Sequence, residues 1–328
     1  MSQTVEAILE PELAIVDAHH HLWEASELLP DIGRYLLPDF LADTESGHRV
    51  VASIYVEAGA MYRAQGPAAF RPVGEVEFAN GMAAASASGT YGPTLACAGI
   101  VGFADLLLGD GVVPVLEALV AAGGGRLRGI RYMAASDPDP TLSTARRPAG
   151  LLRDTRFRAG FAGLAPLGLT FDSWLFHRQL DDAVDLARAF PETTIIIDHT
   201  GGPVRLGAYA ERPDETYREW RQGIAALAAC SNVVMKLGGL GMRLFALPPH
   251  EGTEPLSAHL AVHWRPYIEP SIEAFGPARC MFESNFPVDR ASSSYAVLWN
   301  AFKRLAAGAS LEEKVALFSG TAKRVYRL

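Results

Sequence analysis

The chain has 328 residues, 29 Lys and Arg against 37 Asp and Glu, and a formal net charge of −8. Hydrophobic residues make up 49% and charged residues 20%, a globular composition that excludes a disordered or fibrous protein. An acidic chain without a basic block is unsuited to nucleic acid or an anionic membrane, so we expect neither as a partner. The length fits two average domains or one large α/β barrel.

Cysteine usage and the N-terminus indicate where the protein works. Cys97, Cys230 and Cys280 are odd in number and widely spaced, which argues against disulfides and for a cytoplasmic location. The N-terminal segment has acidic residues and no basic stretch, so we expect no signal peptide. The longest charge-free run, 78–104, contains Asn, Gly and Pro and predicts a helix end, a turn and a buried strand rather than a membrane span.

Eight apolar runs of strand length follow one another along the chain. They span 14–18, 50–57, 95–101, 127–133, 167–174, 193–198, 232–237 and 279–283. Helical patterns lie between several of them, at 75–87, 112–122, 179–190, 214–229 and 291–305. Strands that alternate with helices predict a parallel sheet covered on both faces.

Eight such units fit a closed (β/α)₈ TIM barrel, and a doubly wound open sheet is the alternative. The chain has no strand–GxGxxG–helix unit and no GxxxxGK[ST], so we expect no nucleotide or other organic cofactor. We find no repeat or low-complexity linker and predict one α/β domain over 1–328. The irregular, Pro-bearing segment 243–265 follows the seventh strand, where it would form a lid over the barrel mouth.

The first strand ends in the strongest local signal, Asp-Ala-His-His-His at 17–21. Side chains alternate along a strand, so His19 and His21 should point one way and His20 the other. Two close imidazoles at the carboxyl end of a barrel strand can share a metal ion or a substrate oxygen. A polar histidine cluster in a turn is the alternative.

Two later strand ends carry further candidates. His199 follows the sixth strand within DHTGGP, and it should point into the same mouth unless it is merely hydrogen-bonded in the loop. Glu283 and Asn285 follow the eighth strand within ESNFPVD and share a face by the two-residue period. The alternative for Glu283 is a structural role, as a buried glutamate paired with an arginine.

Five motifs in this order resemble the amidohydrolase-related (amidohydrolase 2) family, in particular its lactonase-like group. They are IVDAHHHLW, IIIDHTGGP, NVVMKLGGLG, RCMFESNFPVD and FSGTAKRVYRL, and together they run from about Ile15 to the C-terminus. The resemblance implies a distorted (β/α)₈ barrel that hydrolyses a lactone or a similar ester or amide. It also implies that His19, His21 and His199 are site residues.

The eighth strand departs from the family pattern. The family usually ends this strand with Gly-Ser-Asp-Trp-Pro, whereas Asn285 stands here in place of the aspartate that serves as base and, in some members, as metal ligand. An amide is a poor base and a weak ligand. We therefore expect Glu283 to supply the carboxylate, with a pKa that burial raises toward the working pH, and Asn285 to orient water or the carbonyl.

The sequence leaves open whether the site binds a metal ion. His177 follows the fifth strand, and it could complete a site with His19 and His21 for one divalent ion such as Zn or Mn. It could equally be an ordinary residue at a helix start, and loss of the aspartate favours a weak or empty site. His259 and His263 have helical i, i+4 spacing without a HExxH glutamate, which favours substrate contact over metal binding.

Several other polar or bulky residues fall at strand ends and are candidates for binding substrate. They are Glu57, Arg131, Lys236, His177, Trp23 and Trp174. Arg131 or Lys236 could bind a substrate carboxylate or instead form an internal salt bridge with Glu57 or Glu283, because a buried cation needs a partner. The tryptophans would form walls of the pocket.

The sequence thus predicts a cytoplasmic lactonase in which His19, His21 and His199 polarise the carbonyl and Glu283 takes the proton of water. The substrate would be a small molecule with a carboxylate or hydroxyls, and formation of a homo-oligomer is left open. The alternatives are a metal-dependent decarboxylase of an aromatic or unsaturated acid on the same barrel, and a catalytically impaired binding homologue.

Overall fold

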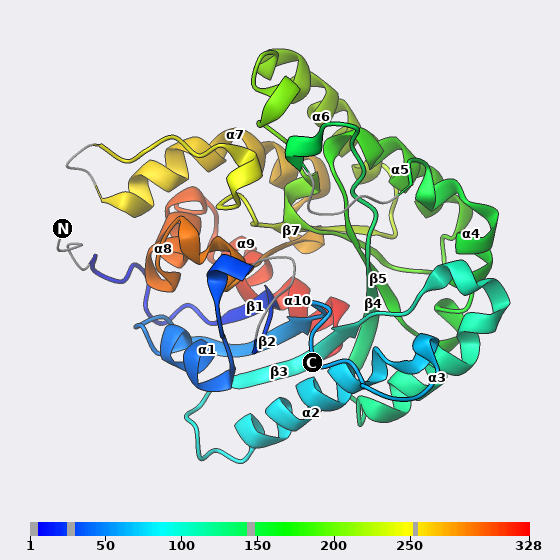
Figure 1. Cartoon of the computed structure of the whole chain (residues 1–328). Coiled ribbons are helices and arrows are strands. Elements are labelled where there is room, and N and C mark those ends of the chain that lie inside the picture. Colours follow the sequence, from blue (N-terminus) through cyan, green and yellow to red (C-terminus); the bar gives the residue numbers. More distant parts are fainter. Residues whose placement is uncertain (1–5, 25–29, 143–147, 252–254) are drawn as a thin grey trace.

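A computed structural model describes residues 6–24, 30–142, 148–251 and 255–328 as an eight-stranded parallel barrel surrounded by helices (Figure 1). The strands pair in sequence order, each with the next. They are β1 Ile15–His20, β2 Val50–Val56, β3 Leu95–Gly102, β4 Leu127–Met133, β5 Thr170–Trp174, β6 Ile195–Ile197, β7 Val233–Leu237 and β8 Cys280–Phe282. The predicted (β/α)₈ fold is confirmed.

The barrel closes irregularly between its last and first strands. A bridge joins His20 to Phe286 beyond the end of β8, and the backbone N–H groups of His21 and Asn285 donate across this seam to Phe286 and His19. The seam therefore brings the histidines of β1 beside the segment that follows β8. Glu283 and Asn285, which form the second half of the predicted site, lie in that segment.

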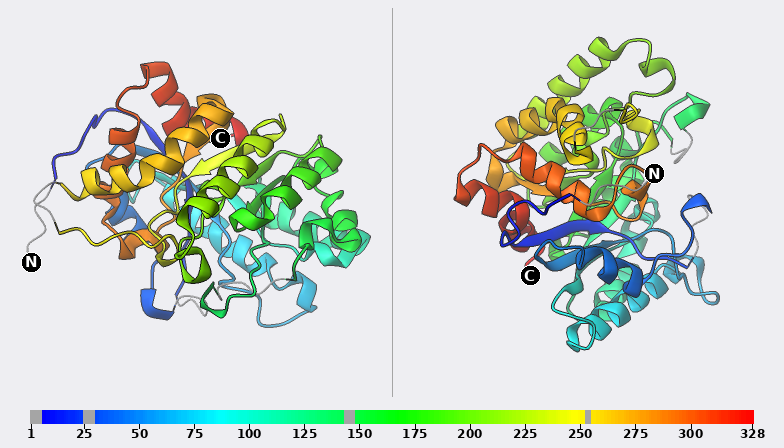
Figure 2. Two further views of the ribbon diagram at one scale, coloured as in Figure 1. Left: turned by 90° about the horizontal axis from the view of Figure 1, so that it is seen from above. Right: turned by 90° about the vertical axis from the view of Figure 1, so that its left-hand side faces the viewer.

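Helices form the outer layer, as the views in Figure 2 show. They are α1 Leu37–Thr44, α2 Val73–Ala87, α3 Val113–Ala122, α4 Thr155–Phe161, α5 Leu180–Ala189, α6 Pro213–Ala228, α7 Leu256–Phe275, α8 Tyr295–Leu305, α9 Leu311–Val315 and α10 Thr321–Val325. The five helices predicted from sequence are present, and their ends differ from the predicted ones by at most four residues. The run 78–104 contains the end of α2 and β3, as expected, and no helix of the described residues is long and apolar enough to cross a membrane.

The barrel interior is packed at its amino-terminal end. Alternate residues of the strands form a small apolar cluster with the C-terminal helix, and the members include Val16, Ile54, Ile196, Val325 and Tyr326. α10 and the residue after it therefore fill the bottom of the barrel, which leaves only the carboxyl ends of the strands for a site.

The segment 243–265 is more ordered than its sequence suggests. Residues 256–265 belong to α7, so the prediction of an irregular segment is wrong there, although α7 contains Pro266 and Pro270. A 3₁₀ turn at Arg243–Phe245 precedes an extended stretch, and residues 252–254 lie outside the described residues. Whether this segment works as a lid stays a prediction.

Candidate active site

Two histidines of β1 meet at the barrel mouth. His19 and His21 point to one side, with their Nε2 atoms 3.1 Å apart, while His20 points to the other and stacks on Phe40. Nδ1 of His21 lies 2.8 Å from the carbonyl oxygen of Val56. Because a carbonyl only accepts, we assign the proton of His21 to Nδ1, and the lone pair of its Nε2 then faces His19.

Glu283 joins the imidazoles of β1 and β6. Its Oε1 accepts hydrogen bonds from the backbone N–H of His199 at 2.9 Å and from Nδ1 of the same residue at 2.7 Å, and its Oε2 lies 3.0 Å from Nδ1 of His19. The bond at Nδ1 leaves the lone pair of His199 on Nε2. Gly239, at φ +67°, makes this arrangement possible, since a Cβ there would lie 2.5 Å from the His199 ring.

The pKa of Glu283 is shifted in the direction opposite to our expectation. Burial alone would raise it, but the adjacent imidazoles of His199 and His19 and their hydrogen bonds lower this pKa to about 2. The expectation was wrong because the sequence indicates that Glu283 is buried but does not show that hydrogen-bond donors surround its carboxylate. The side chain is therefore a permanent carboxylate that orients its partners.

A buried lysine supplies the positive charge of the site. Nζ of Lys236 lies 2.7 Å from Asp172, 3.0 Å from Asp198 and 3.1 Å from Nδ1 of His19. Nδ1 of His19 therefore lies between an ammonium, which only donates, and the carboxylate of Glu283, which only accepts, and the tautomer of this ring decides which of the two it bonds. Burial, followed by the charge of Lys236, lowers the pKa of His19 well below its usual value, and the ring stays neutral.

The predicted substrate-binding cation Arg131 is also paired. Its Nε donates to Glu57 at 2.7 Å, and both side chains are buried. Burial, followed by the charge of Arg131, lowers the pKa of His21 well below its usual value. Arg131 thus has the predicted alternative of a salt bridge with Glu57, whereas the salt bridges of Lys236 are with Asp172 and Asp198 and not with Glu57 or Glu283.

The predicted tryptophans lie against the imidazoles. The Trp23 ring stacks on His21 with centroids 5.7 Å apart, and the Trp174 ring packs edge-on against His199 at 4.7 Å. Both are nearly fully buried. They restrict the rotation of the two histidines.

His177 lies apart from the histidine cluster. Its Nε2 is 3.7 Å from Glu219 of α6, and its ring packs edge-on against Tyr209. The ligand group within mutual reach in the described part of the chain consists of His19, Asp198 and His199 instead, whose donor atoms all lie within 4.8 Å of one another. The geometry gives no support to the set His19, His21 and His177.

Asn285 follows β8 with its amide turned to a second carboxylate. Nδ2 donates to Oδ1 of Asp289 at 2.8 Å, while the backbone N–H of Asn285 donates to the carbonyl oxygen of His19. Burial raises the pKa of Asp289 to about 7, against the hydrogen bond from Gly241. Glu283 and Asn285 therefore serve different neighbours although they are two residues apart.

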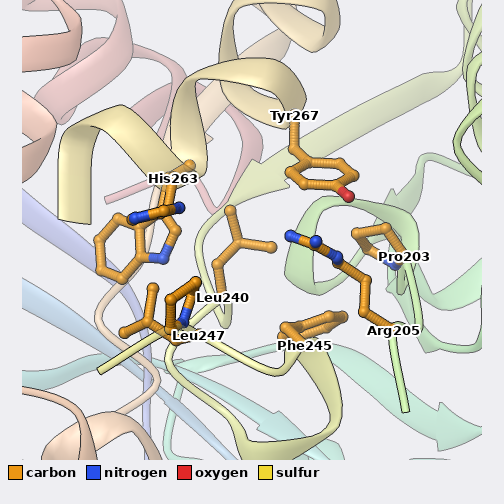
Figure 3. Close-up of a pocket in the computed structure, with 9 residues that line it drawn as sticks. Pro203, Arg205, Leu240, Phe245, Leu247, His263 and Tyr267 are labelled. Atoms are coloured by element: carbon orange, nitrogen blue, oxygen red, sulfur yellow. The ribbon is translucent and has the colours of Figure 1, made fainter. Parts of the chain in front are cut away.

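A small pocket lies beyond β6 and β7, under α7 (Figure 3). Its walls include Leu240 and Phe245 from the β7 loop, and Arg205 extends toward the ring of Tyr267. His263 lines the same pocket, next to the ring of His259. Of the two histidines with i, i+4 spacing, His263 thus lies on this pocket wall, and a role of either in substrate contact stays a prediction.

The sequence model of the amidohydrolase family matches residues 16–328. The chain belongs to the amidohydrolase family. The resemblance inferred from the five motifs is confirmed, and it covers nearly the whole barrel.

Several known proteins are similar to this amidohydrolase over nearly the full length of both chains. The uncharacterized protein y4mH of Sinorhizobium fredii is 32% identical over 97% of this chain and 99% of its own. An L-fucono-1,5-lactonase of Burkholderia multivorans is 29% identical over 95% and 96%. A solved amidohydrolase of Burkholderia multivorans with bound zinc is 27% identical, with a TM-score of 0.73 over 96% of this chain and 99% of that one.

The donor set of this amidohydrolase fits a divalent ion. His19 and His199 offer imidazole nitrogens, and both carboxylate oxygens of buried Asp198 lack a hydrogen-bond partner apart from the nearby Lys236 ammonium. Oε2 of Glu283 also lacks one. Two imidazoles and a carboxylate are ligands that Zn and Mn accept.

Four acids of this amidohydrolase site make contacts that the sequence did not predict. Asp198 and Asp172 surround Lys236, Asp17 accepts from Ser284 and Tyr295, and Asp289 holds Asn285. A signal existed for two of them, because Asp198 ends β6 directly before His199 and Asp172 interrupts an apolar strand. Asp17 opens the histidine motif and Asp289 closes the ESNFPVD motif, but the sequence does not show which partners the fold brings to them.

Proposed function

We propose that this amidohydrolase-family hydrolase opens a lactone ring by attack of water on the ring carbonyl. The observation that carries the proposal is the carboxylate of Glu283 held between imidazoles of β1 and β6 in one buried cluster. The relationship to an L-fucono-1,5-lactonase over nearly the full length of both chains supports a sugar-acid lactone as substrate.

Glu283 sets the chemistry of His199. Since Nδ1 donates to Glu283, Nε2 is left to accept the proton of the attacking water, and the carboxylate stabilises the imidazolium that forms. His199 then returns the proton to the ring oxygen that leaves. This assigns the base role to His199 and an orienting role to Glu283, whose low pKa makes it a poor proton acceptor.

The charges around the cluster favour the negative oxygen of the transition state. Lys236 and Arg131 are both buried within ion pairs, so we propose that they act through the field of the site and by holding His19, rather than by direct contact with the substrate. Because neither cation contacts the substrate directly, the substrate needs no negative charge to bind in this arrangement.

We further propose that His19, Asp198 and His199 can hold one divalent ion. Such an ion, when bound, supplies Lewis-acid polarisation of the carbonyl. Since Nδ1 of His199 donates to Glu283, only its Nε2 could bind the ion, and His199 acts as the base only while that nitrogen is free. Elemental analysis after incubation with zinc and dialysis should find about one ion per chain, and less in Asp198→Asn; an Asp198→Asn protein with unchanged zinc would contradict the ligand set.

A panel of lactones tests the proposed reaction. Sugar 1,5- and 1,4-lactones and unsaturated dicarboxylic lactones, followed with a pH indicator, should reveal turnover, and His199→Ala should lower kcat by about 10²- to 10⁴-fold. His48→Gln is the matched control, because His48 lies before β2 at the opposite end of the barrel and contacts α8. Release of carbon dioxide from aromatic acids without lactone turnover would contradict the proposal.

A further inference from the structure

Hydrogen bonds fix both the backbone and the side chain of Asn285 beside the histidines. Asn285 is 1% exposed and its backbone takes a left-handed conformation, φ +54°, with its N–H bonded to the carbonyl of His19. Its side chain makes one hydrogen bond within the described residues, from Nδ2 to Oδ1 of Asp289 at 2.8 Å. The two ends of this amide therefore lie in different surroundings.

Asp289 determines which end of that amide faces it. The second oxygen of Asp289, Oδ2, accepts from the backbone N–H of Gly241 at 2.9 Å. Because both oxygens of Asp289 accept, one from Gly241 and the other from Nδ2 of Asn285, the Asn285 amide presents its NH₂ group to Asp289 and its Oδ1 is directed the other way. Gly241 is required here, because a Cβ would lie 2.8 Å from Oδ2 of Asp289.

We propose that Asp289 is a positioning residue that fixes the Asn285 carboxamide with its carbonyl oxygen toward the substrate. This oxygen accepts a hydrogen bond from the attacking water or from a substrate hydroxyl, while His199 accepts the proton that is transferred. The inference rests on the proposed function and adds to it a polar contact that the imidazole cluster does not provide.

A purely structural role for Asp289 makes a different prediction. The Asp289 side chain also links the β7 and β8 loops through its hydrogen bond from Gly241, so its removal could act on stability alone. The discriminating variant must therefore keep these hydrogen bonds and change only the polarity of Asn285.

Asp289→Asn is that variant. The carboxamide introduced at position 289 can accept from Gly241 with its oxygen, and its NH₂ group then faces Asn285, whose amide must turn over to accept. Every bond of the link survives, but Asn285 now presents a donor where it had an acceptor. We expect kcat/KM for the lactone to fall roughly 10- to 100-fold, with a change in Tm below about 2 °C.

The double variant Asn285→Asp with Asp289→Asn provides the rescue. The carboxylate introduced at position 285 would accept from the NH₂ group introduced at position 289 and again present an oxygen to the substrate. This variant should be at least about tenfold more active than Asp289→Asn alone. Asp154→Asn, which keeps the N-cap of α4 on the outside of the barrel, serves as the control.

A spectroscopic readout separates this inference from the proposed function. With ¹⁵N-labelled asparagine, the side-chain amide of Asn285 is assigned by its loss in Asn285→Asp, and its proton shifts should change markedly in Asp289→Ala. Unchanged shifts, or full activity of the Asp289→Asn protein, would overturn the inference. Absence of lactone turnover in the wild type would instead overturn the proposed function, whatever the shifts show.

Discussion

The protonation and direction of each site residue depend on what it touches. Alternation along β1 is sufficient to predict that His19 and His21 share a side, because that rule is local. The low pKa of Glu283 and the direction of Asn285 could not be predicted, since they depend on His199 and Asp289. Asp289 lies near Asn285 in the chain, but only the turn after β8 brings their side chains together.

The buried pair of Arg131 and Glu57 gives a test at this scale. Replacement of Arg131 by Met leaves Glu57, 3% exposed, without its counter-charge, so we expect the free energy of unfolding to fall by about 3–5 kcal/mol. Arg63→Met is the matched control, because the Arg63–Glu77 pair is solvent-exposed and worth at most about 1 kcal/mol. Urea unfolding measures both, and equal losses would contradict the account.

At the scale of elements, hydrophobic runs are a good guide to strands and a weaker guide to helices. All eight strands could be predicted because each is an apolar run bounded by polar residues. The prolines around the start of α7 predict a loop where the structure has a helix, and the sequence pattern does not reveal the short helices α1, α4, α9 and α10. In these helices, caps and contacts with the barrel contribute more than periodicity does.

The cap of α4 illustrates this contribution. The side chain of Asp154 accepts from the backbone N–H groups of Arg156 and Phe157 at the start of a seven-residue helix. Asp154→Ala should therefore lower the free energy of unfolding by about 1 kcal/mol. Asp110→Ala, an exposed site without such a cap, should change it by less than about 0.5 kcal/mol; a cap variant that is no less stable than this control would refute the assignment.

Across the whole molecule, the free energy of unfolding should depend on pH through buried acids outside the histidine cluster. Burial, followed by the charge of Glu57, raises the pKa of Glu75 to about 8. Oε1 of Glu75 accepts from Tyr55 and from the backbone of Ala58 and Ala60, whereas Oε2 lacks a partner. A glutamine can reproduce all three bonds through its oxygen.

The sign of the pH effect follows from that raised pKa. The unfolded chain releases the Glu75 proton at lower pH than the folded one, so this contribution to stability is present at acidic pH and is lost as pH rises through about 8. The stability of Glu75→Gln relative to the wild type should therefore be greater at pH 9 than at pH 6, by about 1 kcal/mol or more. Urea unfolding at both pH values checks this, and a stability difference that is the same at both would count against it.

The central claim is that Glu283 holds the imidazoles of β1 and β6 ready to open a lactone, and kcat of Glu283→Gln tests it most directly. The glutamine cannot balance a positive His199, so kcat on the lactone identified from the panel should fall by about 10²- to 10⁴-fold. Glu117→Gln, on the exposed face of α3, should keep wild-type turnover. A folded Glu283→Gln enzyme with near-normal kcat would contradict the account.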